Sequence, residues 1–260
     1  MNKKIYYTNL AKSVRLKILD IIFRSKSSHI ASCFSIVDIL CCLYKKRISK
    51  QKDIFLLSKG HACLALYVVL SKFNYFREKS LNNYGKNNTK FMSHTNHKIH
   101  GVELSTGSLG HALSFGVGKC LAYKIKKIKK KVFVLLSDGE LNEGSNWEAF
   151  MFASHHKLNN LIVIVDYNKI QSLDFINKII KIEPLKKKFL SFGLDVKIID
   201  GHDFNQLEKV FTLKNQKKPL LIIANTIKGK GVREMENKVL WHYKPPNENE
   251  YIKFKSEILK

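Results

Sequence analysis

Two polar side chains, Asp138 and Asn168, each follow an apolar run of the kind that forms a buried strand. They stand 30 residues apart, which leaves room for one helix between the two strands. If the strands are neighbours in a parallel sheet, the carboxylate and the amide oxygen converge on one point. Oxygen ligands of this type suit Mg²⁺ or Ca²⁺, and Gly139 would let the backbone approach a bound ligand closely. The alternative, from the residues alone, is that Asp138 only caps the helix that follows it.

The second half of the chain has the pattern of a parallel α/β sheet, which would position these side chains. Short apolar runs alternate there with helical stretches, as happens when strands are buried on both faces between helices. Ligands bind beyond the carboxyl ends of the strands in such sheets, and this rule selects the residues around Asp138 and Asn168. The expected strands lie at 132–136, 161–165, 196–199 and 220–224, and the expected helices between them at 145–158 and 203–213.

Helical periodicity dominates the first half of the chain. Apolar side chains recur at helical spacing over 10–24, 34–44 and 60–72, and a further helix is expected from Gly110 to about Lys126. Residues 73–106 are polar and weakly periodic, so they predict a long loop layer. No internal repeat or linker divides the sequence, and a single α/β domain is therefore expected.

The charge of the chain is strongly positive, +25 at pH 7, with 46 Lys and Arg against 21 Asp and Glu. A charge of this size is usual in proteins that bind nucleic acids or membrane surfaces. Only five of the 46 basic residues are Arg, however, and Arg is the residue that recognises phosphate and guanine in a bidentate manner. We therefore expect most lysines to face solvent and no nucleic acid to be the partner.

Other classes are excluded by the apolar runs and the cysteines. The longest unbroken apolar run, Ala62 to Leu70, has nine residues, about half of the roughly 20 that a membrane span needs. The first residues carry positive charge but lack the apolar core of a signal peptide. The five cysteines are odd in number and show no Cys-x-x-Cys spacing, so they are expected to be reduced and buried. These features predict a cytoplasmic protein that does not interact with a membrane.

The segment from Ser137 to Gln171 resembles the thiamine-diphosphate motif of the transketolase family. It opens with Ser-Asp-Gly-Glu-Leu-Asn-Glu-Gly and ends with Asp-Tyr-Asn-Lys-Ile-Gln. The family motif opens with Gly-Asp-Gly, so Ser137 is a departure. The resemblance implies that Asp138, Asn168 and the main-chain carbonyl of Ile170 bind Mg²⁺ or Ca²⁺, and that the cofactor's diphosphate completes the metal's ligands.

Two further segments resemble the family's cofactor-binding turns. Ser58–His61 is similar to Ser-x-Gly-His-Ala, and Ser105–Gly110 is similar to Thr-Gly-(Pro/Ser)-Leu-Gly. At the start of a helix, Gly107 and Gly110 could offer free N–H groups. Glu143 resembles a residue of a carboxylate network at the subunit interface, although it could equally be a solvated acid stabilised by the helix dipole. The resemblance implies these cofactor-binding residues: His61, Gly107, Ser108, Leu109, Asp138, Gly139, Glu140, Glu143, Asn168 and His242.

Four of the ten histidines stand in segments that resemble active-site segments of the family, namely His29, His61, His94 and His242. The resemblance implies a catalytic role for them, in which they bind substrate hydroxyl groups and move protons during carbon–carbon cleavage. Local departures are Ile30-Ala31 in place of Pro-Gly and His111 in place of Gln. Asp200–Asp203 matches a further family segment, expected to be structural. The histidines without a catalytic context are expected to be solvated or capping side chains: His97, His100, His155, His156 and His202.

The resemblance runs from about residue 10 to 250, whereas a full transketolase is more than twice as long as this chain. It therefore implies the N-terminal subunit of a split transketolase, which is inactive without a separate C-terminal subunit. The implied assembly of the two kinds of chain is a heterotetramer. Together they would transfer a two-carbon glycolaldehyde unit from a ketose to an aldose, either sugars or sugar phosphates.

The implied domain organisation is one thiamine-diphosphate domain over 1–260, with a helical N-terminal arm at 1–30 and an active-site loop and tail at 226–260. Two alternatives remain open. One is a component of another thiamine-diphosphate enzyme, such as a deoxyxylulose-phosphate synthase or a dehydrogenase. The other is a non-catalytic relic.

Overall fold

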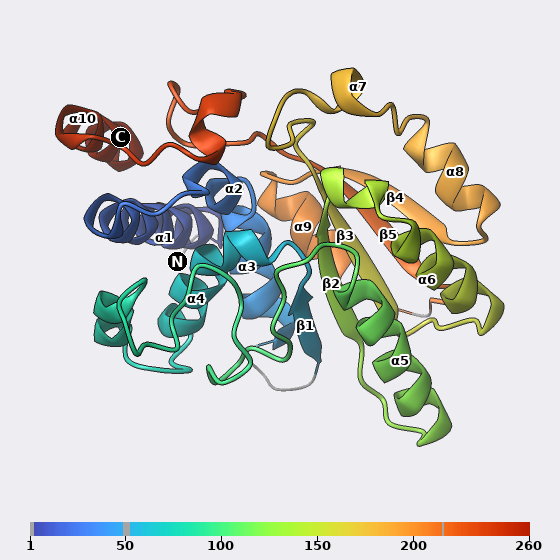
Figure 1. Cartoon of the computed structure of the whole chain (residues 1–260). Coiled ribbons are helices and arrows are strands. Elements are labelled where there is room, and N and C mark those ends of the chain that lie inside the picture. The colour runs from blue at the N-terminus through green and yellow to red at the C-terminus, as the bar shows by residue number, and fades with distance from the viewer. Residues whose placement is uncertain (1–2, 49–52, 215) are drawn as a thin grey trace.

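A parallel sheet forms the centre of the fold (Figure 1). The structure, a computed structural model, describes residues 3–48, 53–214 and 216–260, and within these residues the sheet has five strands. Every pairing between them is parallel, in the order β1-β2-β3-β5-β4. The strands are Ile54–Leu57 (β1), Val132–Ser137 (β2), Leu161–Tyr167 (β3), Asp195–Asp200 (β4) and Leu220–Asn225 (β5).

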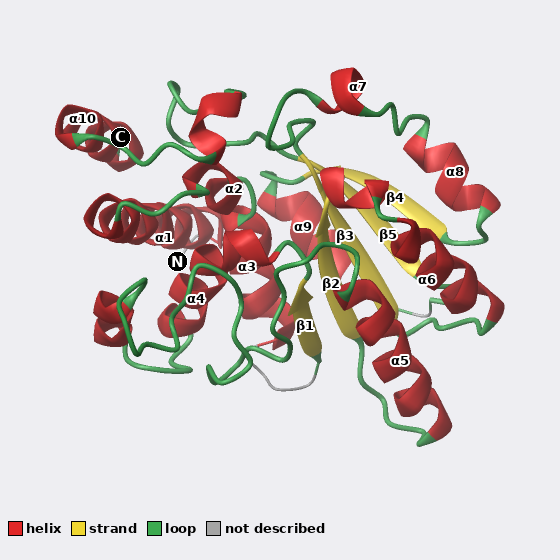
Figure 2. Ribbon diagram, viewed as in Figure 1, coloured by secondary structure: helices red, strands yellow, loops and turns green. Residues whose placement is uncertain are grey.

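Helices cover both faces of this sheet (Figure 2). The α-helices of the described residues are Lys3–Ser25 (α1), Ile30–Phe34 (α2), Val37–Leu43 (α3), Cys63–Lys72 (α4), Ala112–Ile125 (α5), Gly144–His155 (α6), Ile176–Ile179 (α7), Leu185–Ser191 (α8), Phe204–Phe211 (α9) and Glu248–Leu259 (α10).

Strands β1, β2, β3 and β5 are buried on both faces, which explains why they read as continuous apolar runs, whereas the edge strand β4 is partly exposed. In β2, Phe133 and Leu135 point into one apolar core, and Val132 and Val134 point into the other. The first core lies under α1 to α4 and α9, and the second lies under α5, α6 and α8. The predicted α/β class with a parallel sheet between two helical layers is confirmed.

The expected helices are confirmed with two changes of detail. The stretch expected at 34–44 is divided, because α2 ends at Phe34 and α3 begins at Val37. The helix expected from Gly60 begins with the 3₁₀ turn Gly60–Ala62, and α4 follows it directly. The expected loop layer at 73–106 contains one short 3₁₀ helix, Glu78–Asn83.

Strand β1 and the helices α7, α8 and α10 are not predicted by the sequence patterns above. Strand β1 has only four residues, too few to show a period, and it forms by pairing with β2 along Ile54–Leu57. Helix α10 does carry a local signal, because Asn247 and Glu250 form a reciprocal capping box at its start.

Helix α1 makes up most of the expected N-terminal arm, whose first two residues lie outside the described residues. It packs against α3, α4 and α10, and its Val14, Ile18 and Ile22 belong to the first apolar core. Within the part of the chain that the structure describes, none of the helices has the length and apolar character of a membrane span. All five cysteines are buried and free, as predicted.

The two glycines of α5 give a matched pair of stability predictions. Gly116 faces β2, and a Cβ atom there would lie 2.8 Å from Cγ2 of Val134. Gly118 is exposed and has nothing within 4 Å of the same position. We expect Gly116→Ala to lower the free energy of unfolding by about 1–2 kcal/mol, because the strand must shift. Gly118→Ala should raise it by about 0.5–1 kcal/mol through helix propensity. Equal effects of the two changes in urea denaturation would contradict the predicted close approach of α5 to β2.

Candidate active site

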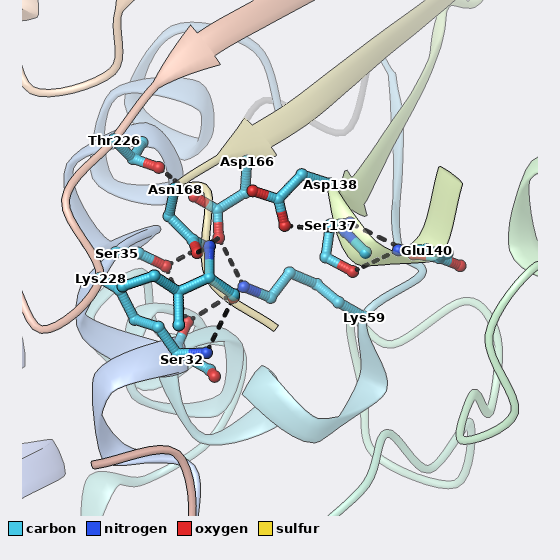
Figure 3. Close-up of polar contacts among 12 residues, drawn as sticks. Ser32, Ser35, Lys59, Ser137, Asp138, Glu140, Asp166, Asn168, Thr226 and Lys228 are labelled. Atoms are coloured by element: carbon cyan, nitrogen blue, oxygen red, sulfur yellow. Dashed lines mark hydrogen bonds and ion pairs between the residues drawn. The ribbon is translucent and has the colours of Figure 1, made fainter. Parts of the chain in front are cut away.

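Polar side chains at the carboxyl ends of four strands meet at one edge of the sheet (Figure 3). The strands that carry Asp138 and Asn168 are neighbours, since Ser137 of β2 pairs with Asp166 of β3. Strand β5 lies on the other side of β3, and β1 lies on the other side of β2. The residues that the four strands bring to this edge are Ser58, Lys59, Asp138, Asp166, Asn168, Thr226 and Lys228.

The side chains of the predicted metal ligands are held in place by hydrogen bonds. The Asp138 carboxylate is 1% exposed and accepts from the main-chain N–H groups of Gly139 at 2.8 Å and Lys169 at 2.5 Å. Asn168 donates through Nδ2 to Asp166 at 3.0 Å, and its Oδ1 accepts from the N–H of Ile170 at 3.1 Å. Asp138 therefore does bond to the turn that follows it, as the capping alternative requires, but it also bridges to the end of β3.

The environment of Asp138 favours a cation as its partner. Burial, followed by the charge of Asp166, raises the pKa of Asp138 to about 7. A cation bound to this carboxylate would stabilise its charged form. A carboxylate, an amide oxygen and a main-chain carbonyl oxygen form a hard donor set that suits Mg²⁺ or Ca²⁺. The donor set thus fits the predicted metal.

A buried ion pair forms the floor of the site. Nζ of Lys59 lies 2.6 Å from Oδ2 of Asp166, and the two side chains are 1% and 0% exposed. Asp166 also accepts hydrogen bonds from the hydroxyl groups of Ser35 and Thr226. Burial works against ionisation of Asp166, but Lys59 and these donors outweigh it and lower the pKa of Asp166. The end of β3, which precedes Asn168, is therefore fixed by the contacts of Asp166 with Lys59, Ser35 and Thr226.

The four predicted catalytic histidines converge on one cavity of about 260 Å³ above this floor. The ring of His29 lies 5.2 Å from that of His61, 5.1 Å from that of His242 and 6.3 Å from that of His94, centre to centre. These residues come from four separate segments of the chain, so only the fold unites them. The other predicted site residues that line the cavity are Gly107, Leu109, Asp138, Gly139, Asn168 and Ile170.

Three of these imidazoles are neutral near pH 7. Burial, then the charges of neighbouring groups, lowers the pKa of His29 to about 4 and that of His242 to about 3. The pKa of His61 is lowered well below its usual range, again chiefly by burial. Neutral imidazoles can both donate and accept hydrogen bonds, which suits binding of substrate hydroxyl groups.

Lys228 lies beside His242 and the predicted metal ligand Ile170. Its Nζ lies 3.0 Å from the carbonyl oxygen of Ile170, 3.2 Å from that of Gln171 and 2.8 Å from Nδ1 of His242. Burial, followed by the charge of Lys59, lowers the pKa of Lys228 to about 7. A protonated amine donates to all three atoms, whereas an uncharged amine donates to the two carbonyls and accepts from Nδ1 of His242.

The departure at Ile30-Ala31 is accommodated by the backbone before α2. His29 has a left-handed conformation with φ of 72°, and its N–H donates to the carbonyl of His242 at 2.8 Å. Oγ of Ser28 lies 2.9 Å from Nδ1 of the His29 ring. Ile30 and Ala31 are fully buried. The main chain thus joins the two histidine segments directly.

Three predicted cofactor-binding residues, Ser108, Glu140 and Glu143, are not among the residues that line the cavity. Ser108 is exposed on the outside of its turn. Glu140 is fully buried and accepts from the hydroxyl of Ser58 and from the N–H of Gly110 at 2.8 Å. The N–H of Gly110 is consequently not free, contrary to the expectation above. Glu140 holds the turn that carries Gly107 and Leu109 from behind, and Glu143 is exposed at the start of α6.

Several site residues are not among the sequence predictions: Ser32, Lys59, Asp166, Gln171 and Lys228. The sequence does indicate that Asp166 has a buried polar partner, because a carboxylate that follows an apolar strand directly is buried and needs one. Nothing local identifies Lys59 as that partner among the many lysines of the chain. Gln171 lines the cavity, and its buried Nε2 has no hydrogen-bond partner in the structure.

Comparison with known proteins shows the family of this chain. A family model described as "Transketolase, thiamine diphosphate binding domain" matches residues 7–258. The chain is 39% identical to an apulose-4-phosphate transketolase subunit from Actinobacillus succinogenes, over 92% of this chain and 91% of that protein. It is 34% identical to the 6-deoxy-6-sulfo-D-fructose transketolase subunit SqwG of a Clostridium species, over 89% and 88%.

Solved structures show the same fold in longer chains. The transketolase of Campylobacter jejuni superposes with a TM-score of 0.90 at 29% identity, and the match covers 99% of this chain but only 43% of that one. The parallel sheet, the site at its carboxyl edge and the matched residues lead to one conclusion. The chain belongs to the transketolase family and corresponds to its thiamine-diphosphate-binding domain.

Proposed function

We propose that this chain is the N-terminal subunit of a two-chain transketolase that transfers a two-carbon ketol unit from a ketose to an aldose. The observation that carries the proposal is the cavity at the sheet edge, where an all-oxygen ligand set lies beside four histidines. Thiamine diphosphate, when bound, supplies the electron sink that carbon–carbon cleavage needs.

The residues of the site fit this cofactor and its metal. Asp138, Asn168 and the carbonyl of Ile170 would hold Mg²⁺, for which Ca²⁺ could substitute. Nε2 of Gln171, which has no partner among the described residues, would donate to a diphosphate oxygen. Gly139 lies against Gln171, since a Cβ atom at this glycine would be 2.9 Å from Cγ of Gln171. Only glycine at position 139 allows the side chain of Gln171 to lie this close to the main chain.

The remaining cavity residues act on the substrate and the cofactor ring. Gly107 and Leu109 would lie beside the thiamine, and Glu140 keeps their turn in place. His29 and His94 would bind substrate hydroxyl groups, while His61 and His242 would contact both cofactor and substrate. Because burial keeps the imidazoles of His29, His61 and His242 neutral, each can accept a hydrogen bond at one ring nitrogen and donate one at the other. A ring that takes up a proton at one nitrogen stays uncharged only if it releases the proton of the other nitrogen in the same step.

A second chain completes the active site in this proposal. The relatives of similar length are named as transketolase subunits, and the chain spans 43% of the full-length transketolase from Campylobacter jejuni. We therefore propose that a separate C-terminal subunit joins this chain in a heterotetramer with two copies of each. The free, buried thiols accord with action in the cytoplasm. The two relatives are named for different sugars, so the substrate class proposed here is only a ketose donor and an aldose acceptor.

The test is reconstitution with the second chain. We expect the purified chain to show no ketol transfer, and the mixture with the product of the neighbouring gene to transfer the two-carbon unit between sugars or sugar phosphates. Calorimetry of the mixture with thiamine diphosphate and Mg²⁺ measures binding separately. Full activity of the chain alone would disprove the two-chain proposal. Cofactor binding without ketol transfer would favour another thiamine-diphosphate enzyme, and absence of binding would favour a relic.

A further inference from the structure

A buried network of charged and polar groups lies behind the cofactor site. Nη1 and Nη2 of Arg15 donate to the two carboxylate oxygens of Asp38 at 3.0 Å and 2.7 Å. Arg15 comes from α1 and Asp38 from α3, and the two residues are 7% and 4% exposed. The ring of His202, in the loop after β4, approaches the same carboxylate with Nδ1 2.7 Å from Oδ2. His202 is thus not the solvated side chain that its sequence context predicts.

The partners of His202 identify its tautomer. Arg15 and His202, outweighing the effect of burial, keep the pKa of Asp38 well below its usual range. Asp38 is therefore an ionised acceptor, and Nδ1 of His202 carries the hydrogen between them. The main-chain N–H of Ile227 donates to Nε2 of His202 at 2.9 Å, so Nε2 carries no hydrogen.

Ile227 belongs to the segment that delivers two site residues from the end of β5. Thr226, just before it, donates to Asp166. Lys228, just after it, donates to the carbonyl of Ile170 and lies 2.8 Å from Nδ1 of His242. The bond to His202 fixes the main chain between these two side chains. A small displacement there would move Lys228 relative to the carbonyl that is proposed to bind the metal.

The loop of His202 and the segment of Ile227 are packed together at two further points. The N–H of Gly201 donates to the carbonyl of Asn225 at 2.7 Å. A Cβ atom at Gly201 would lie 2.4 Å from Cγ2 of Thr226, so only glycine allows this approach. On the other side, Gly231 lies against Arg15, with 3.1 Å between its would-be Cβ and Cδ of Arg15.

We propose that His202 is a positioning residue, which, held by Asp38 and Arg15, keeps the Thr226–Lys228 segment in the geometry that binds metal and thiamine diphosphate. The proposal rests on the proposed function for the identity of the cofactor. It gives the Asp200-Gly201-His202-Asp203 segment a role in the site, although none of its residues lines the cavity.

The test compares His202→Leu and His202→Gln in the two-chain complex. Leucine removes both hydrogen bonds, whereas the amide of glutamine can donate to Asp38 and accept from Ile227. Calorimetry with thiamine diphosphate and Mg²⁺ should show about tenfold weaker binding for His202→Leu, as for other residues that orient ligands indirectly. Glutamine should restore most of the lost affinity.

Tyr7→Phe is the matched control for general destabilisation. It removes a hydrogen bond of 2.8 Å between α1 and Glu208 of α9 and no contact with the cavity. We expect this control to lower Tm without changing cofactor affinity. Unchanged affinity in His202→Leu, equal weakening in the control, or no rescue by glutamine would each overturn the proposal.

Nitrogen NMR of the histidine-labelled chain gives a test that needs neither cofactor nor substitution. The signal of His202 should show a protonated Nδ1 and an unprotonated Nε2. A protonated Nε2 would overturn the proposal whether or not the cofactor binds. Failure of the wild-type complex to bind thiamine diphosphate would instead count against the proposed function.

Discussion

Asp138→Asn is expected to abolish Mg²⁺-dependent binding of thiamine diphosphate while the chain remains folded. Asp138 supplies the carboxylate of the proposed ligand set, and asparagine has the same shape without the negative charge. We expect the affinity for the cofactor in the presence of Mg²⁺ to fall at least about a hundredfold, the upper end of the range for residues that only support a metal ligand. Ketol transfer by the two-chain complex should be lost with it.

The stability of this variant distinguishes a ligand from a structural cap. The buried carboxylate of Asp138 has a raised pKa, so its charge destabilises the fold when no metal is present. Asparagine can still accept from Gly139 or Lys169, and Tm without metal should therefore be equal or higher. Asp195→Asn, at the amino end of β4 and the opposite end of the sheet, is the charge-matched control and should bind normally. A large drop in Tm with retained binding would show that Asp138 is mainly a cap.

Lys59→Met is expected to cause the largest loss of stability. It leaves Asp166 buried and charged without the ammonium group that lies 2.6 Å away. Breaking a buried pair by removing one partner costs about 3–5 kcal/mol, because the remaining charge is uncompensated. Such a loss is a large part of the stability of a typical domain, and urea denaturation with circular dichroism will measure it.

A second substitution separates the charge effect from the loss of packing. In Lys59→Met/Asp166→Asn, the amide oxygen can still accept from one of Ser35 and Thr226, which donate to different carboxylate oxygens of Asp166, and no unpaired charge is buried. The double variant should therefore be more stable than Lys59→Met. Lys119→Met breaks a partly exposed ion pair with Glu103 at 3.1 Å and should cost at most about 1 kcal/mol. If Lys59→Met lowered the free energy of unfolding no more than Lys119→Met, the ion pair of Lys59 and Asp166 would not be a buried pair that stabilises the site.

Local patterns were sufficient to predict most of the sheet and its class. Four of the strands are apolar runs long enough to be recognised, and helices between them imply parallel pairing. Strand β1 is not predicted, because four apolar residues are too few to show a period. It forms by pairing with β2, which lies more than seventy residues later in the sequence. Helix α10 was missed even though its capping box is a local signal.

The candidate site could be predicted where a residue type is rare and its context specific. Asp138 and Asn168 follow recognisable strands, and four histidines stand in segments that resemble one family. Lys59 could not be selected in the same way, since it is one of a large excess of lysines in a chain with a charge of +25. The sequence predicts a solvated or capping side chain for His202, because nothing near it in the sequence indicates that Asp38 lies 2.7 Å away.

The sequence by itself determined the fold class, the family and the candidate metal ligands, because strand period, helix spacing and motif residues are properties of short segments. Only the tertiary structure decided which side chains share the cavity and which support it from behind. Glu140 and His202 show the difference: each is buried by segments far away in the sequence, and their hydrogen-bond partners exist only once the strands have paired. Burial also lowers the pKa values of His29, His61 and His242 and raises that of Asp138, because desolvation depends on everything that surrounds a group rather than on its neighbours in the chain.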